Sequence, residues 1–130
     1  MKKLNLLPIL SIALILSLIM ITYTACKKDT EITCNLSKAD SAPADMSVIF
    51  KAVNTGDGAI STLTYKVGST TKTVSNPTLP WSVTVDALDG DAISITAEGT
   101  TSDGSLTVSY DGKGAGHEII GSDNCSHSNN

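Results

Sequence analysis

Cys26 stands where a thiol can act as a nucleophile at a membrane surface. It follows almost directly on a nearly unbroken apolar run, Leu4 to Tyr23, and the small residue Ala25 precedes it. Two lysines lie before that run, directly after the first residue. A short positive region, an apolar run and a small residue at its end are typical of a removable targeting segment. We therefore expect residues 1–25 to be cleaved off and the Cys26 thiol to carry lipid.

This N-terminal arrangement resembles the lipobox of bacterial lipoproteins, in which a cysteine receives diacylglycerol before cleavage. Tyr23 departs from the aliphatic residue that is usual three positions before that cysteine. The apolar run is also long enough to remain as a membrane-spanning helix, or to be removed as an ordinary signal peptide. The resemblance implies a lipid-anchored protein outside the cytoplasm, in the outer membrane or at the cell surface of a bacterium with two membranes. The membrane is then its first partner.

Cys34 and Cys125 remain as an even pair if Cys26 is acylated. Disulfides form and persist outside the cytosol, where an even number of free cysteines is expected. A Cys34–Cys125 bridge closes a loop of about 90 residues, for which the chain-entropy model gives about 4–5 kcal/mol of stabilisation. The alternative is that both are unpaired small hydrophobic residues. We expect the bridge.

The two histidines, His117 and His127, are the remaining candidates for general acid–base chemistry. His117-Glu118 lacks the second histidine of a zinc-protease helix and lies in a strand-like segment. His127 lies in a polar segment near the end of the chain, and no Gly-x-Ser-x-Gly motif occurs. The sequence therefore predicts a protein that is not an enzyme.

A set of aspartates, Asp86, Asp89 and Asp91, offers carboxylate oxygens of the kind that bind Ca²⁺. Their spacing is not that of an EF-hand, and turn-forming aspartates beside glycine explain them equally well. We expect no other cofactor. All nine basic residues are lysine and the net charge is −4, so a phosphate-binding surface for nucleic acid is not expected.

Alternating apolar and polar residues dominate the chain from residue 47 onward, and this period of two predicts strands with one buried face. Aspartate–glycine and asparagine–proline pairs separate the segments and indicate turns. No helix is needed after residue 26, and the polar segment 26–45 shows no sustained periodicity. We expect an all-β protein with a tether over 26–45, a two-sheet antiparallel sandwich over 46–125 and a polar tail over 126–130. Its seven strands are expected near residues 47–52, 62–67, 71–74, 81–85, 93–97, 106–110 and 117–120.

The segment from Val48 to Gly112 resembles the extracytoplasmic domain of the MmpS family, small membrane-anchored proteins that accompany MmpL-type transporters. The residues that carry the resemblance are Val53-Asn54-Thr55-Gly56, Leu63-Thr64-Tyr65, Leu79-Pro80-Trp81-Ser82-Val83-Thr84-Val85 and Leu106 to Gly112. The resemblance implies an immunoglobulin-like sandwich without an active site that works through a partner in envelope export or organisation. Lipid replaces the family's usual transmembrane anchor here, and Leu106 stands where the family often has a cysteine.

Trp81 begins a predicted central strand after Pro80, and we expect it to anchor the core rather than to stack on a ligand. Two functions remain open. The first is a non-enzymatic envelope lipoprotein that binds or scaffolds another envelope protein. The second is a surface module for a glycan or small ligand, using the loops Asp86 to Asp91 and Asp111 to Gly116. Because the predicted strands point their aromatic side chains inward, the sequence favours the protein partner.

Overall fold

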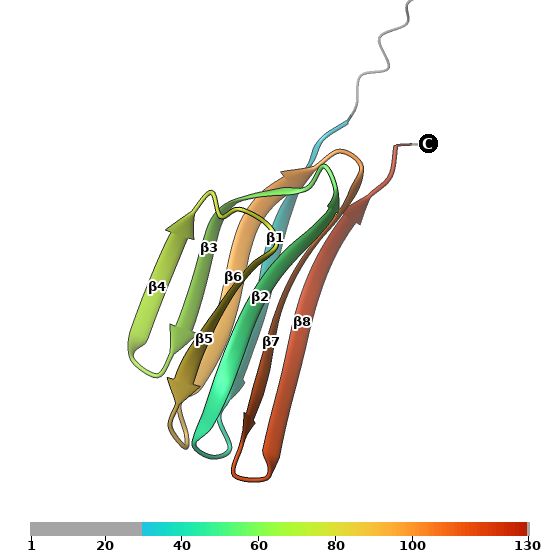
Figure 1. The fold of residues 1–130 in the computed structure, drawn as a ribbon. Coiled ribbons are helices and arrows are strands. Elements are labelled where there is room, and N and C mark those ends of the chain that lie inside the picture. Colours follow the sequence, from blue (N-terminus) through green and yellow to red (C-terminus); the bar gives the residue numbers. More distant parts are fainter. Residues whose placement is uncertain (1–29, 130) are drawn as a thin grey trace, which may run out of the picture.

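The computed structural model describes residues 30–129, which form eight strands (Figure 1). All strand pairings are antiparallel. Within residues 30–129, no helix is long and apolar enough to cross a membrane. The strands are β1 (Ile32–Ser41), β2 (Met46–Gly56), β3 (Ala59–Val67), β4 (Thr70–Ser75), β5 (Trp81–Ala87), β6 (Ala92–Thr101), β7 (Gly104–Gly114) and β8 (His117–His127). The predicted all-β class is confirmed.

Two four-stranded sheets, with the strand orders β1-β6-β3-β4 and β5-β2-β7-β8, pack against each other (Figure 1). Alternation along β2 shows why: Met46, Val48, Phe50 and Ala52 are buried, while the residues between them are exposed or half-buried. The same period recurs in β6 and β7. Each sheet therefore has one apolar face, and the two faces meet to form the core. The predicted two-sheet sandwich is confirmed.

The expectation of a polar tether over residues 26–45 is wrong for half of its length, because Ile32–Ser41 forms strand β1. β1 lies at a sheet edge and pairs only with β6. Cys34 and Leu36 are its two buried residues, so its apolar periodicity is too short to be recognised. Residues 30–129 thus form eight strands rather than seven, and the first of these strands begins six residues after Cys26.

The last strand is also longer than expected. β8 spans His117–His127, whereas the sequence indicated a weak strand near residues 117–120 and a polar tail from residue 126. Gly121 is the buried residue in its burial pattern, and the other positions are half-buried or exposed. Backbone pairing with β7 holds β8 in place over its whole length, from Gly104↔His127 to Gly114↔His117.

The connections between strands are of two kinds, hairpins within one sheet and crossings between the two sheets. β3–β4 and β7–β8 are hairpins within one sheet, and every other connection crosses to the opposite sheet. β1 and β2 lie in different sheets, whereas the constant-type immunoglobulin order places its first two strands side by side. The strand order therefore departs from the expected immunoglobulin-like arrangement, because β1 completes a sheet with β6 instead of forming a hairpin with β2.

The prediction that Trp81 lies on a central strand and anchors the core is corrected. β5 is an edge strand, and Trp81 is a half-buried residue packed against the core. Phe50 and Tyr110, both on inner strands, are the largest fully buried side chains. Tyr65 lies between Phe50 and Trp81: its ring centroid is 5.3 Å from that of Phe50 and 5.7 Å from that of Trp81. Trp81 thus closes the core at its margin.

Candidate functional site

The two ends of the sandwich differ in what they carry. The start of β1 and the end of β8 lie together at one end, which we call the N-terminal end (Figure 1). This end also has the β2–β3 and β6–β7 turns. The opposite end, which we call the hairpin end, carries the β3–β4, β5–β6 and β7–β8 turns together with the β1–β2 connection. Because Cys26 precedes β1, any anchor at this residue enters at the N-terminal end.

Cys26 itself lies outside the described residues, so its lipidation stays a prediction. What the structure adds is the start of the fold at Ile32, which leaves residues 27–31 between the two. A fully extended chain spans at most about 3.3–3.6 Å per residue, so these five residues reach about 17 Å. If Cys26 carries the predicted anchor, this reach places the N-terminal end close to the lipid surface.

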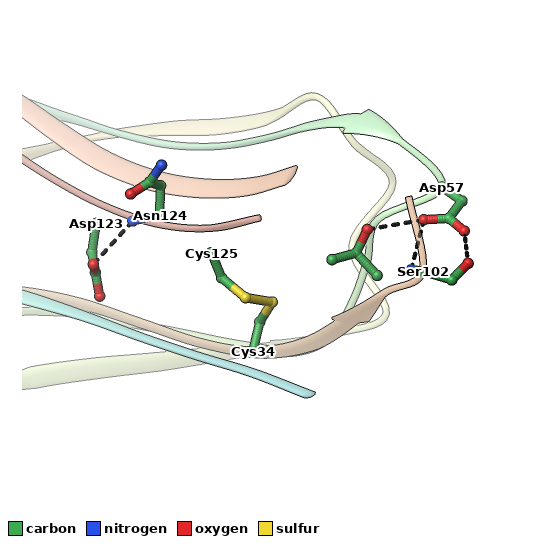
Figure 2. Close-up of a disulfide and its surroundings, with 7 residues drawn as sticks. Cys34, Asp57, Ser102, Asp123, Asn124 and Cys125 are labelled. Carbon is green, nitrogen blue, oxygen red and sulfur yellow. Dashed lines mark hydrogen bonds between the residues drawn. A yellow bond between two sulfur atoms is a disulfide. The ribbon is translucent and has the colours of Figure 1, made fainter. Parts of the chain in front are cut away.

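A disulfide joins Cys34 of β1 to Cys125 of β8, as predicted, and Figure 2 shows it in its surroundings. The Cα atoms are 5.8 Å apart, and Cys34 is buried. The bridge links the first strand to the last and one sheet to the other. Its sequence separation of 91 residues corresponds to about 4–5 kcal/mol in the chain-entropy model. Covalent closure of this kind is typical of domains outside the cytosol.

The same margin of the sandwich has a polar closure that the sequence did not reveal. Asp123 of β8 accepts a hydrogen bond through Oδ2 from the backbone N–H of Ser37 in β1, at 2.9 Å. Its other oxygen accepts from the N–H of Asn124 at 2.9 Å. An edge strand that offers unpaired N–H groups invites pairing with another chain. Asp123 occupies one such group, so the disulfide margin is a closed edge.

Asp57 ties together the two turns of the N-terminal end (Figure 2). Its carboxylate accepts hydrogen bonds from Thr101 Oγ1 at 2.9 Å, from the N–H of Ser102 at 3.0 Å and from the N–H of Asp103 at 2.9 Å. The Ser102 hydroxyl donates a further bond. These donors, the Ser102 hydroxyl above all, hold the pKa of Asp57 well below its ordinary range. The sequence indicated only a turn at Asp57-Gly58.

The histidines do not share a site. His117 begins β8 and His127 ends it, and a strand rise of about 3.3 Å per residue puts them roughly 33 Å apart. Near His117, Lys113 Nζ pairs with Glu118 Oε1 at 2.9 Å and with Asp111 Oδ2 at 3.7 Å. The hydrogen bond with Glu118 is the main cause of a raised pKa of Lys113. This group is a solvated ion cluster on the outer face of its sheet.

The three aspartates proposed for calcium are not gathered around one point. Asp86 lies on β5 with its side chain exposed, and Asp89 is exposed in the β5–β6 turn. Asp91 uses Oδ2 to accept a hydrogen bond from the N–H of Leu88 at 3.0 Å. Among residues 30–129, no group of three or more His, Cys, Asp or Glu side chains is placed to hold a metal ion. Asp91 supports the β5–β6 turn through its side chain, Asp89 lies in that turn, and Asp86 precedes it on β5.

The loops proposed as a binding surface do lie at one end. Ser47 of β2 pairs with Asp86 on one side and with Lys113 on the other, so both loops flank the same level of the sheet. A hollow of about 300 Å³ opens beside the first loop, between β5 and the β3–β4 turn. Leu88 lines it and is 65% exposed. The hairpin end therefore combines a hollow, an exposed apolar side chain and carboxylates.

No protein-family model, curated protein or solved structure matches the chain.

Proposed function

We propose that this chain is a non-enzymatic lipoprotein of the bacterial cell envelope, anchored through Cys26, whose sandwich binds or scaffolds another envelope protein. The observation that carries the proposal is the Cys34–Cys125 disulfide, which leaves Cys26 as the remaining cysteine of the three. A covalent bridge between the first and last strands suits an oxidising compartment. A cysteine placed just past an apolar run suits lipidation there.

The short reach from Cys26 to Ile32 supports a domain that stands on the membrane rather than on a long stalk. Residues 27–31 span about 17 Å at most, while an eleven-residue strand such as β2 extends about 36 Å from end to end. The hairpin end is then the part of the domain that reaches farthest from the lipid. A partner meets the side and hairpin end of the sandwich, not its N-terminal end.

The finer form of the proposal is an immunoglobulin-like, MmpS-like domain that assists an MmpL-type exporter. This form is supported by the sequence resemblance over Val48 to Gly112. Two of the motifs that carry it have these positions in the fold: Leu79-Pro80 leads into β5, and Tyr110-Asp111-Gly112 lies in β7. The strand order differs from the constant-type immunoglobulin order at β1, which the disulfide joins to β8, so this finer form rests on the sequence resemblance alone.

A protein partner is favoured over a glycan because of where the aromatic rings lie. Phe50 and Tyr110 are fully buried, and Tyr65 and Trp81 pack against the core and against each other. Sugar rings usually need a flat aromatic face open to solvent. The aromatic side chains of the described residues lie in the core or pack against it.

The proposal is tested by metabolic labelling of the native host with an alkyne-bearing fatty acid, followed by purification of the chain. We expect label in the wild-type protein and none in Cys26→Ser. Equal labelling of both variants, or of neither, contradicts the lipoprotein assignment. In-cell photo-crosslinking from the hairpin end then tests the partner. Recovery of the same envelope protein in repeated experiments supports scaffolding, and recovery of glycan alone favours the second function.

A further inference from the structure

The β5–β6 turn at the hairpin end holds an apolar side chain out into solvent on a loop that several hydrogen bonds fix. Leu88 is 65% exposed, yet its own N–H donates to Asp91 Oδ2 at 3.0 Å and its carbonyl accepts from the Asp91 N–H at 3.0 Å. The Asp89 N–H donates to Asp45 Oδ1 at 2.9 Å. A loop held in one conformation in this way loses little conformational freedom when a partner binds to it.

Two further bonds fix this turn against the rest of the fold. Ala42, in the β1–β2 connection, donates its N–H to the carbonyl of Asp91 at 2.8 Å and accepts from the N–H of Gly90 at 2.8 Å. Gly68 lies against the other side of the Asp91 carboxylate, where a Cβ atom would come within 2.6 Å of Oδ1. The loop is therefore locked between the β1–β2 connection and the β3–β4 turn.

The hollow beside Leu88 has an apolar floor and an acidic rim. Val67, Val85 and Leu88 contribute the apolar surface, and Asp86 and Asp91 contribute carboxylates. Its volume, about 300 Å³, lies at the lower limit of the roughly 300–1,000 Å³ typical of ligand pockets. It has room for one or two side chains rather than for a large ligand.

Charge decides which occupant fits. Asp45, Asp86, Asp89 and Asp91 all lie around this turn. Among residues 30–129, the lysine that forms ion pairs is Lys113, and its partners are Asp111 and Glu118 rather than these four. The rim therefore keeps its negative potential for an incoming group. A cationic segment is attracted to it, while an anionic peptide or an acidic lipid surface is repelled.

We propose that this hollow is the docking site for an extended segment of the partner protein in which lysine or arginine flanks an apolar side chain. The inference rests on the proposed function and names the chemistry of the partner. The apolar side chain enters between Val67 and Val85, and the flanking cations meet Asp86 and Asp89. β5 borders the hollow, and in the described part of the chain no strand covers its outer edge, so an extended segment has backbone to pair with.

The test uses the full chain, purified with its own anchor and inserted in phosphatidylcholine nanodiscs. Three blocked hexapeptides are the probes: one alternates lysine with valine or leucine, one replaces every lysine by glutamate, and one replaces every apolar residue by serine. Calorimetry measures the affinity of each. We expect the cationic apolar peptide to bind about tenfold more tightly than either of the others, because only it satisfies both rim and floor.

Two variants locate the binding. Asp86→Asn combined with Asp89→Asn removes charge from side chains that accept none of the turn's hydrogen bonds, and we expect it to weaken binding about fivefold or more. Leu88→Ser is expected to weaken it to a similar degree. Matched controls are Ile120→Ser, which changes a 67% exposed apolar residue on β8, at the opposite edge of the sheet from β5, and Asp103→Asn combined with Glu98→Gln. These should change affinity less than about twofold.

Equal binding of the glutamate peptide, absence of binding by all three probes, or a larger loss with Ile120→Ser than with Leu88→Ser overturns the inference. Thermal midpoints of all variants are measured first, so that a loss of binding is read only in folded protein. Acylation of Cys26 is measured by mass on the same sample. A chain that is acylated but does not bind keeps the proposed function and loses this docking site.

Discussion

Gly121 of β8 lies directly opposite Tyr110 of β7 and leaves the space that the tyrosine ring fills. The two residues are register partners, and a Cβ atom at Gly121 would lie 2.3 Å from Cζ of the ring. The ring passes over this glycine, and the Tyr110 hydroxyl donates a hydrogen bond to Asp40 Oδ2 of β1 at 3.2 Å. One aromatic side chain thus connects β7, β8 and the first strand.

Gly121→Ala is expected to be more destabilising than Tyr110→Phe. The alanine methyl group forces the buried ring or the β8 backbone to move, and overpacking of this kind costs about 1–3 kcal/mol. Tyr110→Phe keeps the ring and removes one hydrogen bond, which costs about 0.5–1.5 kcal/mol. Urea unfolding of both variants measures the difference. The reverse order contradicts the packing described for this pair.

The Tyr110 hydroxyl also predicts how stability changes at alkaline pH. Burial, together with the nearby Asp40 carboxylate, raises the pKa of Tyr110 to about 12 from 10.0. A pKa that is higher in the folded state contributes stability below the unfolded value, and this contribution is lost as pH rises from about 10 towards 12. We expect Tyr110→Phe to lose less stability than the wild type over that range. Identical alkaline profiles would place the hydroxyl in water.

The loss of folding stability at low pH should depend on Asp57. Its pKa in the folded state lies below the ordinary value of 3.8, so its contribution is complete above that value and is lost as pH falls below it. Asp57→Asn should therefore be less stable than the wild type at neutral pH and should lose less on acidification. Ser102→Ala removes one hydrogen-bond donor, so both its stability at neutral pH and its loss of stability on acidification should lie between those of the wild type and of Asp57→Asn. An unchanged acid profile in Asp57→Asn refutes the role of this clamp.

Removal of the disulfide should weaken the fold without changing its architecture. Cys34→Ala combined with Cys125→Ala is expected to cost about 4–5 kcal/mol by the chain-entropy model, within the range of about 2–5 kcal/mol seen for small secreted domains. Denaturant unfolding measures this loss of stability, and Cys26→Ser serves as the control because it replaces the cysteine that is not in the bridge. A loss below about 1 kcal/mol would mean that β1 and β8 are held mainly by Asp123 and packing.

Phe50→Ala and Trp81→Ala test where the core lies. Removing a fully buried phenylalanine costs about 3–5 kcal/mol, and Phe50 is fully buried on inner strand β2. Trp81 is half-buried on edge strand β5, so its truncation should cost less. Tyr65→Leu, between them, provides the intermediate case. A greater loss at Trp81 would restore it as the core anchor.

Much of the fold could be predicted because inner strands bury alternate residues. β2 and β7 show this period over most of their length, and Met46 to Ala52 is sufficient to identify a strand. β1 escaped detection because an edge strand at a closed margin buries only Cys34 and Leu36. Strand order was beyond reach as well, since the alternation in β6 is the same whether its neighbour is β1 or another strand.

The site was predictable only where a residue count or a local turn pattern indicates it. Pairing of Cys34 with Cys125 followed from counting cysteines, and the loops near Asp86 and Lys113 followed from turn residues. The hydrogen bonds of Asp57 and Asp123 join residues more than 40 positions apart, so no local pattern reports them. The hollow beside Leu88 requires the β3–β4 turn to lie against β5, which only the assembled sandwich shows.

We propose that lipid on Cys26 holds this sandwich at the membrane. Intact mass spectrometry of the protein purified from its own membranes, on reduced and unreduced samples, determines whether that lipid is present. We expect a chain that begins at residue 26, carries the added mass of a diacylglyceryl group with or without a further acyl chain, and gains two hydrogens on reduction of Cys34–Cys125. A chain that still begins at Met1, or one cut near residue 26 without acyl mass, contradicts it.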